Sequence, residues 1–380
     1  MKCPICNNKN FQLLKKVEKY KPLILSFDGK KPRFDNIVSL AVNSCQKCSH
    51  IFIKTDFEEL DSFYKDSAPR GMLSLNLSDR DLMAKNIIDD LIDRFELKSL
   101  CEIGGGCGGF TANLCKEREF DNIVLVDPIL ENNREVKKVI ENVKRLRLYS
   151  NLHFEKENNM VDLVVMRQVL EHIKEPKMFL KQSFELLKTD GFSYIEVPNV
   201  LYTLEKKQGF DLCFEHLQYF SPDNLKYLLT NMGMDIISWG FTKDKHDMYV
   251  VCKKNSKRTV VKNEFNKDDV KTTEKVLLEF PRFGGEWIAY GLNSNLESIL
   301  NFTESTIPEF IIDDSVAYEG AVFFGEKKIH CTNSQLIRKS NDSIFSTAYY
   351  VVTAPYYFSQ IRKKILDINS KAEVRSILVT

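Results

Sequence analysis

Short apolar runs alternate with amphipathic stretches along the middle of the chain. Residues 78–97 carry apolar side chains at helical spacing among acidic and basic ones, which predicts an amphipathic helix. Residues 177–187 predict another helix, which a Thr-Asp-Gly turn at 189–191 is expected to end. Continuous apolar runs predict buried strands at 122–126, 161–166 and 192–198. Elements in this order predict an α/β domain with a mostly parallel sheet and helices on both faces.

Changes in this pattern divide the chain into three parts. A turn-rich N-terminal stretch precedes the central domain, and a polar, charged break at 253–258 follows it. Beyond the break, further apolar runs within 286–291, 310–314 and 349–354 predict a second, smaller α/β unit. The expected domains are residues 1–70, 71–252 and 253–380.

A glycine-rich segment follows the first predicted helix. Residues 100–110 read Leu-Cys-Glu-Ile-Gly-Gly-Gly-Cys-Gly-Gly-Phe, which predicts a strand, a tight turn and the start of a helix. Glycine suits such a turn because it accepts positive φ and lets a ligand approach the bare backbone. A dinucleotide site would space its glycines Gly-x-Gly-x-x-Gly. Here the pattern is instead Glu102-x-Gly104-x-Gly106-x-Gly108.

This pattern resembles the first motif of class I S-adenosylmethionine-dependent methyltransferases. In that family the glycine turn accommodates the methionine part of the cofactor, and an acidic residue after the next strand binds the ribose hydroxyls. Here the apolar run at 122–126 ends in Asp127 and Pro128, at about the expected separation. A carboxylate can accept two hydrogen bonds from a diol. The structural alternative is a glycine loop that only packs strand on helix, with Asp127 as a cap.

The strand at 161–166 leads into Arg-Gln-Val-Leu-Glu-His, and the same family has a Val-Leu-Glu-His segment beside the methionine end of the cofactor. Gln168 is the expected contact there, since its amide can serve both ammonium and carboxylate groups. Glu171 and His172 either take part in the chemistry or only hold the turn together. Ligands on such sheets bind at the carboxyl ends of the strands, where Gly104, Asp127, Gln168 and Pro198 are all expected.

Two Cys-x-x-Cys pairs lie in the N-terminal part, Cys3 with Cys6 and Cys45 with Cys48. Each pair can present two thiolates on one tight turn, and two such turns complete a tetrahedral zinc site. We interpret the zinc (Zn2+) as structural because four cysteines leave no open coordination position. A redox protein needs only one such pair, and unrelated reduced thiols are a third alternative. The neighbouring His50 is expected to be a surface histidine.

Composition excludes several classes of protein. A hydrophobic content of 43% and a charged content of 28% over 380 residues describe an ordinary globular protein of two or three domains. A formal net charge of +1 gives no general attraction to nucleic acid or anionic membranes. No apolar stretch is long enough to span a bilayer, and the N-terminus begins no signal peptide. We therefore expect a cytoplasmic protein, whose ten cysteines are reduced unless they bind metal.

The segment after the last predicted strand of the central domain narrows the resemblance. Residues 213–221 read Cys-Phe-Glu-His-Leu-Gln-Tyr-Phe-Ser. They resemble the Tyr-His-Glu-His-Leu-Ser-Tyr-Phe-Ser segment of the zinc-containing sugar C-methyltransferases, bacterial enzymes that methylate a carbon of nucleotide-linked keto-sugars. That family joins a four-cysteine zinc domain, a central methyltransferase domain and a C-terminal Rossmann-like domain. The resemblance covers essentially the whole chain and implies a role in cell-surface glycan biosynthesis.

The resemblance also implies roles for individual residues. A carbon next to a ketone must lose a proton before it attacks a methyl sulfonium, and an imidazole is a suitable base. His216 takes this role by resemblance, with Glu215 positioning the substrate or the base and Tyr219 in the same motif. Tyr64, on the linker at 57–72, is expected either to reach over the substrate pocket or to be simply packed. For His216 the alternative is a histidine that caps a loop.

Departures from the family pattern leave the acceptor open. The family's first tyrosine, which contacts the sugar near its keto group, is Cys213 here, and its histidine is Phe214. In the C-terminal unit the family's turn, approximately Gly-Tyr-Gly-Ala-Pro-Ala-Lys-Gly, becomes Ala-Tyr-Gly-Leu-Asn-Ser-Asn-Leu at 289–296. The family's C-terminal domain helps to hold the nucleotide end of the substrate. Without the lysine and the last glycine, both this role and a purely structural one stay open.

We therefore expect an S-adenosylmethionine-dependent methyltransferase whose partner is a small-molecule substrate, a nucleotide-linked sugar, rather than nucleic acid or a membrane. The first alternative is O- or N-methylation of a sugar or related small metabolite, because His216 can equally deprotonate a hydroxyl or an amine. The second is a non-catalytic cofactor-binding module whose zinc ribbon docks a protein partner.

Overall fold

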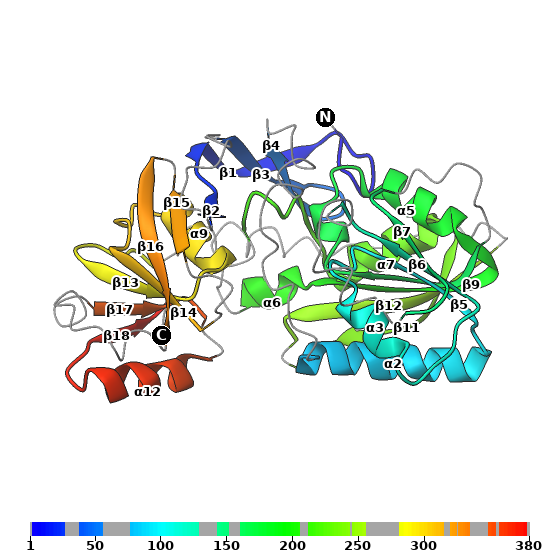
Figure 1. Cartoon of the computed structure of the whole chain (residues 1–380). Helices are drawn as coiled ribbons and strands as arrows, with labels where there is room; N and C mark the ends of the chain where they lie inside the picture. The colour runs from blue at the N-terminus through cyan, green and yellow to red at the C-terminus, as the bar shows by residue number, and fades with distance from the viewer. Residues whose placement is uncertain are drawn as a thin grey trace.

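The computed structural model describes residues 2–26, 38–55, 77–128, 143–151, 160–205, 212–243, 245–255, 281–314, 320–324, 326–334, 349–354 and 357–377. Their strands form three sheets. In Figure 1 the N-terminal sheet lies at the top in blue, the central sheet at the right and the C-terminal sheet at the left. No helix within these ranges is both long enough and apolar enough to cross a membrane.

The central sheet has seven strands in the order β11-β12-β9-β8-β5-β6-β7. The five strands from β9 to β7 are parallel, whereas β12 is antiparallel to both β9 and β11. The strand order therefore reverses between β5 and β8, and such a reversal opens a crevice at the carboxyl ends of the two strands. The strands are β5 (Ser99–Ile103), β6 (Asn122–Val126), β7 (Leu146–Tyr149), β8 (Val161–Arg167), β9 (Leu187–Pro198), β11 (Met234–Phe241) and β12 (Asp247–Lys254).

Helices cover both faces of this sheet because successive side chains of a strand point to opposite faces. On β8, Leu163 and Val165 pack with α2 and α3, whereas Val164 and Met166 pack with α5 and α7. The helices are α2 (Asp79–Phe95), α3 (Gly109–Leu114), η2 (Leu170–His172), α5 (Pro176–Glu185), α6 (Val200–Glu205) and α7 (Pro222–Asn231). The predicted α/β domain with a mostly parallel sheet is thus confirmed.

Local sequence signals determine the start of α2 but not the start of β9. Ser78 begins α2 through a capping box, in which its hydroxyl accepts the Asp81 N–H and the Asp81 carboxylate accepts the Ser78 N–H. The predicted turn at 189–191 is wrong as an element boundary, since β9 already begins at Leu187. Between the pairs Val161–Leu187 and Leu163–Phe192 the strand bulges, with Asp190 at a φ of 62°. Pairing with β8 on both sides of the turn absorbs it into the strand.

The N-terminal sheet is antiparallel, in the order β1-β3-β4-β10. Its first three strands are β1 (Phe11–Tyr20), β3 (Val38–Cys45) and β4 (Ile51–Thr55). The fourth, β10 (Gln218–Tyr219), comes from the central part of the chain, within the segment that resembles the sugar methyltransferases. The N-terminal strands therefore form one sheet with the candidate catalytic segment.

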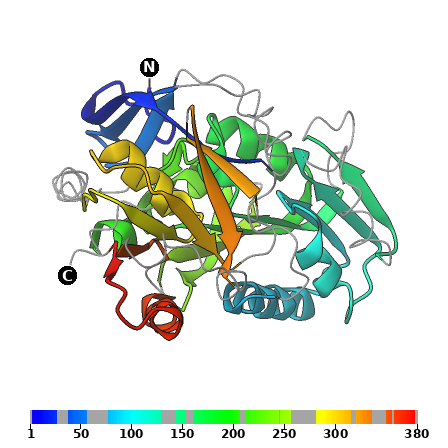
Figure 2. The same ribbon diagram turned by 60° about the vertical axis from the view of Figure 1, so that its left-hand side comes forward.

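The C-terminal sheet confirms the predicted second α/β unit. Its order is β18-β17-β13-β14-β16-β15-β2, parallel from β18 to β16. Helix α9 (Ser294–Phe302) packs on one face and α12 (Phe358–Ile368) on the other; Figure 2 shows them in yellow and red on either side of the sheet. The strands are β2 (Leu23–Ser26), β13 (Trp287–Tyr290), β14 (Phe310–Asp313), β15 (Gly320–Phe324), β16 (Lys327–Asn333), β17 (Tyr349–Val352) and β18 (Val374–Ser376).

Helix α9 connects the three sheets. The buried carboxylate of Glu297 accepts hydrogen bonds from the Tyr20 hydroxyl at 2.6 Å and from the Leu23 N–H at 2.9 Å, where the chain passes from β1 to β2. The next residue, Ser298, donates its hydroxyl to the Leu212 carbonyl at 2.7 Å, just before the candidate catalytic segment. Adjacent residues of one helix thus hold both the N-terminal part and the central domain.

Candidate active site

The glycine turn lies between β5 and α3 at the reversal of strand order. Gly104, Gly106 and Gly108 have φ values of 73°, 56° and 81°, in the left-handed region that favours glycine. A Cβ on Gly104 would lie 2.1 Å from Cγ2 of Val169, the residue after Gln168. Both the positive φ values and the close neighbour Val169 therefore exclude a side chain at this turn. A turn without side chains is what a ligand that approaches the backbone requires.

The carboxylate of Asp127 lies against the glycine turn. It lies at the end of β6, is 6% exposed, and accepts the Gly106 N–H at 2.8 Å. The Gly104 N–H donates to the carbonyl of Val126 at 2.7 Å, so two hydrogen bonds hold the turn against the end of β6. Pro128 follows directly and is half-buried. The predicted cofactor residues of the turn and of β6 therefore meet, which fits a group with an amino-acid part and a ribose.

Glu102 lies beneath the turn. Its buried carboxylate accepts hydrogen bonds from the N–H and the hydroxyl of Thr111, on the first turn of α3. Burial raises the pKa of this carboxyl group. A Cβ on Gly105 would lie 2.9 Å from Glu102 Oε2, so the carboxylate also lies close under the turn. In this position Glu102 supports the glycine turn from the protein side.

Gln168 stands at the carboxyl end of β8, opposite the glycine turn. Its φ of 54° turns the chain sharply out of the strand, and its N–H donates to the carbonyl of Glu196 at 2.9 Å. Its amide nitrogen is 3.5 Å from the carboxylate of Glu196. The side chain is half-buried, and the next residue, Val169, is the one that lies against Gly104.

A cluster of charged residues borders this end of the sheet and was missed by sequence reasoning. Arg167 donates to Asp81 at 2.6 Å and lies 3.5 Å from Glu196, with its guanidinium 4.3 Å from the Phe110 ring. Arg80 forms ion pairs with Glu196 at 3.8 Å and with Asp247 at 3.2 Å, so it links these two carboxylates. The only signal in the sequence is that Glu196 interrupts an apolar strand. This cluster fixes the start of α2 against the ends of β8 and β9 and the start of β12.

The two histidine-containing segments meet beside the turn. The His172 N–H donates to the Val169 carbonyl at 3.0 Å, and its Nδ1–H donates to the carbonyl of Glu215 at 2.9 Å. The rings of His172 and His216 are in edge contact, with centroids 4.8 Å apart. Burial, and then the neighbouring His216, lower the pKa of His172 to about 3, so His172 is neutral near pH 7.

The other residues of the predicted motif have different surroundings. Glu215 and His216 are half-buried, whereas Tyr219 is buried and donates its hydroxyl to the carbonyl of Cys213 at 3.4 Å. Tyr219 packs in the core that the N-terminal sheet forms with α6 and the catalytic segment, with its ring 6.4 Å from that of His216. Tyr64 lies outside the described residues.

The N-terminal sheet is hydrogen-bonded to the candidate catalytic segment. The Ile53 N–H donates to the Leu217 carbonyl at 2.9 Å, and the Leu217 N–H donates to the Glu171 carbonyl at 2.7 Å. His50 is fully buried and bonds to Gln218. The expectation of a surface histidine is therefore wrong, because β10 and Phe220 cover its ring.

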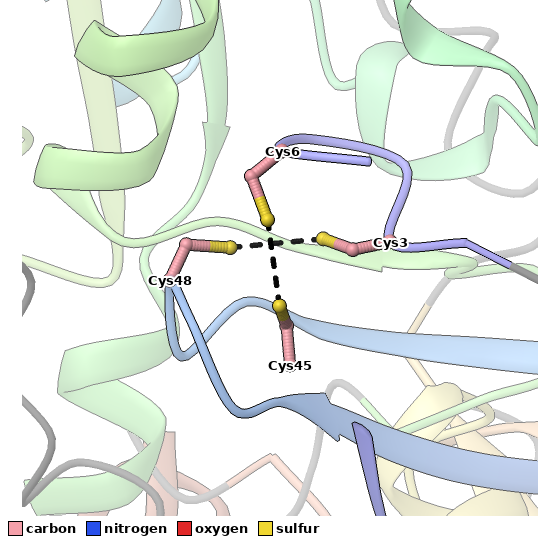
Figure 3. Close-up of side chains that lie close together, drawn as sticks. All are labelled: Cys3, Cys6, Cys45 and Cys48. Atoms are coloured by element: carbon pink, nitrogen blue, oxygen red, sulfur yellow. Dashed lines mark hydrogen bonds between the residues drawn. The ribbon is translucent and has the colours of Figure 1, made fainter. Parts of the chain in front are cut away.

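The four cysteines of the N-terminal part converge. Figure 3 shows the four sulfurs pointing toward one centre, from the turn at Cys3 and Cys6 and from the end of β3. The Sγ atoms of Cys3 and Cys48 are 3.6 Å apart and those of Cys6 and Cys45 are 3.5 Å apart. In a tetrahedral site with Zn–S bonds of about 2.3 Å, the sulfurs lie about 3.8 Å apart. The donor set and its spacing thus fit a zinc ion.

Comparison with known proteins agrees with the fold. Residues 78–238 match a family described as "Methyltransferase domain". No curated protein matched the chain at a significant level.

Three solved structures are similar to part of this chain. A 1,6-didemethyltoxoflavin-N1-methyltransferase of Burkholderia thailandensis, with 1,6-didemethyltoxoflavin and S-adenosylhomocysteine bound, is 14% identical, with a TM-score of 0.41 over 59% of this chain and 99% of that one. An S-adenosylmethionine-dependent methyltransferase from Archaeoglobus fulgidus is 18% identical, with a TM-score of 0.36 over 52% and 100%. One from Clostridium acetobutylicum is 15% identical, with a TM-score of 0.38 over 48% and 94%.

The domain that carries the glycine turn and Asp127 is thus the part of the chain that matches a known family. Its mostly parallel sheet, with helices on both faces, is the class I methyltransferase fold. Residues 78–238 therefore form a class I S-adenosylmethionine-dependent methyltransferase domain, and the chain is a methyltransferase.

Proposed function

We propose that this enzyme transfers a methyl group to a carbon next to the ketone of a nucleotide-linked sugar. One observation carries the proposal: the glycine turn and the histidine pair are neighbours. Gly104 faces Val169, the carbonyl of Val169 accepts the His172 N–H, and the His172 ring packs against His216. An imidazole near the donor pocket is what proton abstraction before methyl transfer requires.

S-adenosylmethionine supplies the methyl group when it is bound. We assign its methionine part to the turn of Gly104, Gly106 and Gly108, with the side chain of Gln168 as a further contact. The carboxylate of Asp127 is suited to the ribose hydroxyls because it can accept two hydrogen bonds from a diol. Glu102 and Pro128 complete the proposed cofactor site from below the turn and from the end of β6.

His216 is the proposed general base. A neutral imidazole takes the proton of the acceptor carbon, and the neutral state of His172 avoids a like charge beside the imidazolium that forms. Glu215 is held by its carbonyl to His172 Nδ1 and is proposed to orient the substrate or the base. Tyr219 and, from the linker, Tyr64 complete the proposed catalytic set.

The remaining parts receive supporting roles in the proposal. The four cysteines hold a structural zinc, which requires reduced thiols and agrees with a cytoplasmic enzyme. The C-terminal unit, bound to the catalytic segment through Ser298, helps to hold the nucleotide end of the substrate. The domains are 1–70, 71–252 and 253–380, and the methylated sugar serves cell-surface glycan synthesis.

Methylation of oxygen or nitrogen is the second candidate, and Cys213 favours it. Where the sugar C-methyltransferases have a tyrosine near the keto group, Cys213 is buried and offers no phenol. His216 would then deprotonate a hydroxyl or an amine in the same position.

Hydrogen exchange separates the two candidates. A set of keto-sugar nucleotides is first screened with S-adenosylmethionine for a gain of one methyl group by mass spectrometry. The accepted substrate is then incubated in heavy water with S-adenosylhomocysteine. We expect deuterium to enter beside the ketone with the wild type and with the His330→Ala control, which changes an exposed histidine of β16, but not with His216→Ala. Methyl transfer without any exchange would instead point to oxygen or nitrogen.

A further inference from the structure

Three side chains with metal-ligating atoms meet beside the proposed cofactor site. One ligand atom from each of Glu171, His172 and His216 lies within 4.8 Å of the other two. Among the described residues, this group and the four cysteines are the two clusters of this kind. Glu171 and His172 belong to η2. His216 is held beside them because the N–H of the next residue, Leu217, donates to the Glu171 carbonyl.

The orientation of His172 suits a metal ligand. Its Nδ1–H donates to the Glu215 carbonyl at 2.9 Å, so Nε2 carries the lone pair. Nε2 is 3.8 Å from Oε1 of Glu171, whose side chain is 1% exposed. Metal-bound histidines commonly donate their other ring N–H to a backbone carbonyl in this way, which fixes both the tautomer and the ring. The His172 side chain is 20% exposed, so solvent reaches this ligand.

The spacing requires only a small closure. Ligand atoms about 2.0–2.2 Å from a tetrahedral metal lie about 3.3–3.6 Å from one another. Closing the group from at most 4.8 Å to this spacing requires its ligand atoms to move inward by about 1 Å. Two imidazoles and one carboxylate suit zinc, nickel or iron(II) rather than calcium or magnesium.

We propose that Glu171, His172 and His216 bind a divalent transition-metal ion, with a fourth position open to solvent or substrate. This site differs in its ligands from the four-cysteine cluster, which offers only sulfur. The ion takes a lone pair of His216, and the same lone pair accepts the proton in the proposed reaction. Metal binding therefore inhibits methyl transfer; this consequence, unlike the binding itself, rests on the proposed function.

Cobalt(II) is the first probe. Full-length protein is prepared with one zinc per chain, confirmed by elemental analysis, and then titrated with Co2+. We expect one further equivalent to bind, with visible d–d absorption but without the thiolate-to-cobalt charge-transfer band that the cysteine cluster would produce. Glu171→Gln and His172→Gln should each weaken this binding at least about 100-fold, whereas His330→Ala should not change it. Zinc content and the thermal unfolding curve show whether each variant is folded.

Chemical protection gives a readout that needs no substrate. Diethyl pyrocarbonate modifies accessible imidazoles, and mass spectrometry locates the modified residues. We expect Ni2+ to protect His216 and a chelator to restore its modification, while the exposed His330 is modified throughout as an internal control.

The outcomes distinguish this inference from the proposed function. The metal site is overturned if the protein binds no second equivalent of Co2+, or if folded Glu171→Gln binds Co2+ as well as the wild type. Neither result affects the test of His216 by deuterium exchange into the substrate. If Co2+ binds but deuterium exchange into the substrate continues, the metal and the proton do not compete for His216. That result argues against His216 as the base.

Discussion

His50 Nε2 and Gln218 Oε1 lie 2.9 Å apart, which ties the N-terminal part of the chain to the candidate catalytic segment. The Gln218 amide nitrogen donates to the Ile173 carbonyl at 3.0 Å, so Oε1 is the acceptor and His50 carries its proton on Nε2. One buried amide in β10 therefore joins the residue before β4 to the residue after η2. Residues that follow His216 are therefore held by a part of the chain that lies far away in sequence.

Gln218→Leu should lower the free energy of unfolding by about 1–3 kcal/mol, because it leaves the buried His50 N–H and the Ile173 carbonyl without their partner. Urea denaturation followed by circular dichroism measures the change. Gln360→Leu, on the exposed face of α12, is the matched control and should have little effect. Equal stability of both variants would show that the bridge between the two parts contributes nothing.

Gly104→Ala should abolish tight cofactor binding. An alanine at this position would have to adopt a φ of 73°, which is unfavourable for any residue with a side chain. Its Cβ would also lie 2.1 Å from Val169 Cγ2, so the turn or η2 would have to move. Titration calorimetry with S-adenosylhomocysteine should show affinity reduced at least about 10-fold, the equivalent of about 1.4 kcal/mol. Gly284→Ala is the matched control, since nothing lies within 4 Å of its added Cβ. Unchanged affinity in Gly104→Ala would move the donor pocket away from this turn.

Asp127→Asn tests the ribose contact. Loss of a charged hydrogen-bond acceptor costs about 1.5–3 kcal/mol, which corresponds to roughly 10- to 150-fold weaker binding of S-adenosylhomocysteine. Asp190→Asn provides the comparison, because this carboxylate is 71% exposed and lies on the bulge of β9. If the two variants bind equally well, Asp127 acts only as a brace for the Gly106 N–H.

Removal of the proposed zinc should affect the catalytic segment as well as the N-terminal sheet. Cys45 ends β3, and the turn through Cys48 leads into β4, which pairs with β10. Cys45→Ser should lose about one zinc per chain by elemental analysis and should lower methyl transfer once a substrate is known. Cys115→Ser, which changes a cysteine outside the cluster, should retain the metal. A wild-type protein that contains no zinc when purified from zinc-supplied cells would contradict the site.

Exchange of backbone amide hydrogens, measured by mass spectrometry, tests whether the loss of zinc loosens residues 213–221. Peptides that contain residues 213–221 should exchange faster in Cys45→Ser than in Cys115→Ser, because the β4–β10 hydrogen bonds depend on a formed N-terminal sheet. Equal exchange would mean that the segment keeps its conformation without the metal.

Features that depend on neighbours in sequence could be predicted from the sequence. Ser78 and Asp81 cap α2 through residues three positions apart, and the glycines at 104, 106 and 108 adopt positive φ within one turn. The order of strands and helices predicted the α/β fold, and two Cys-x-x-Cys turns predicted a cluster of four sulfurs. Each of these signals is a local preference of the backbone or a repeated spacing of side chains.

Only the tertiary structure decided which distant segments meet. Nothing in the residues of β2 or β10 assigns one to the C-terminal sheet and the other to the N-terminal sheet, because the pairing of a strand depends on the edge it meets. The burial of His50, the absorption of the turn at 189–191 into β9 and the pairing of Arg167 with Asp81 have the same origin. Hydrogen bonds and packing between residues far apart in the chain determine these features, and local sequence preferences do not record them.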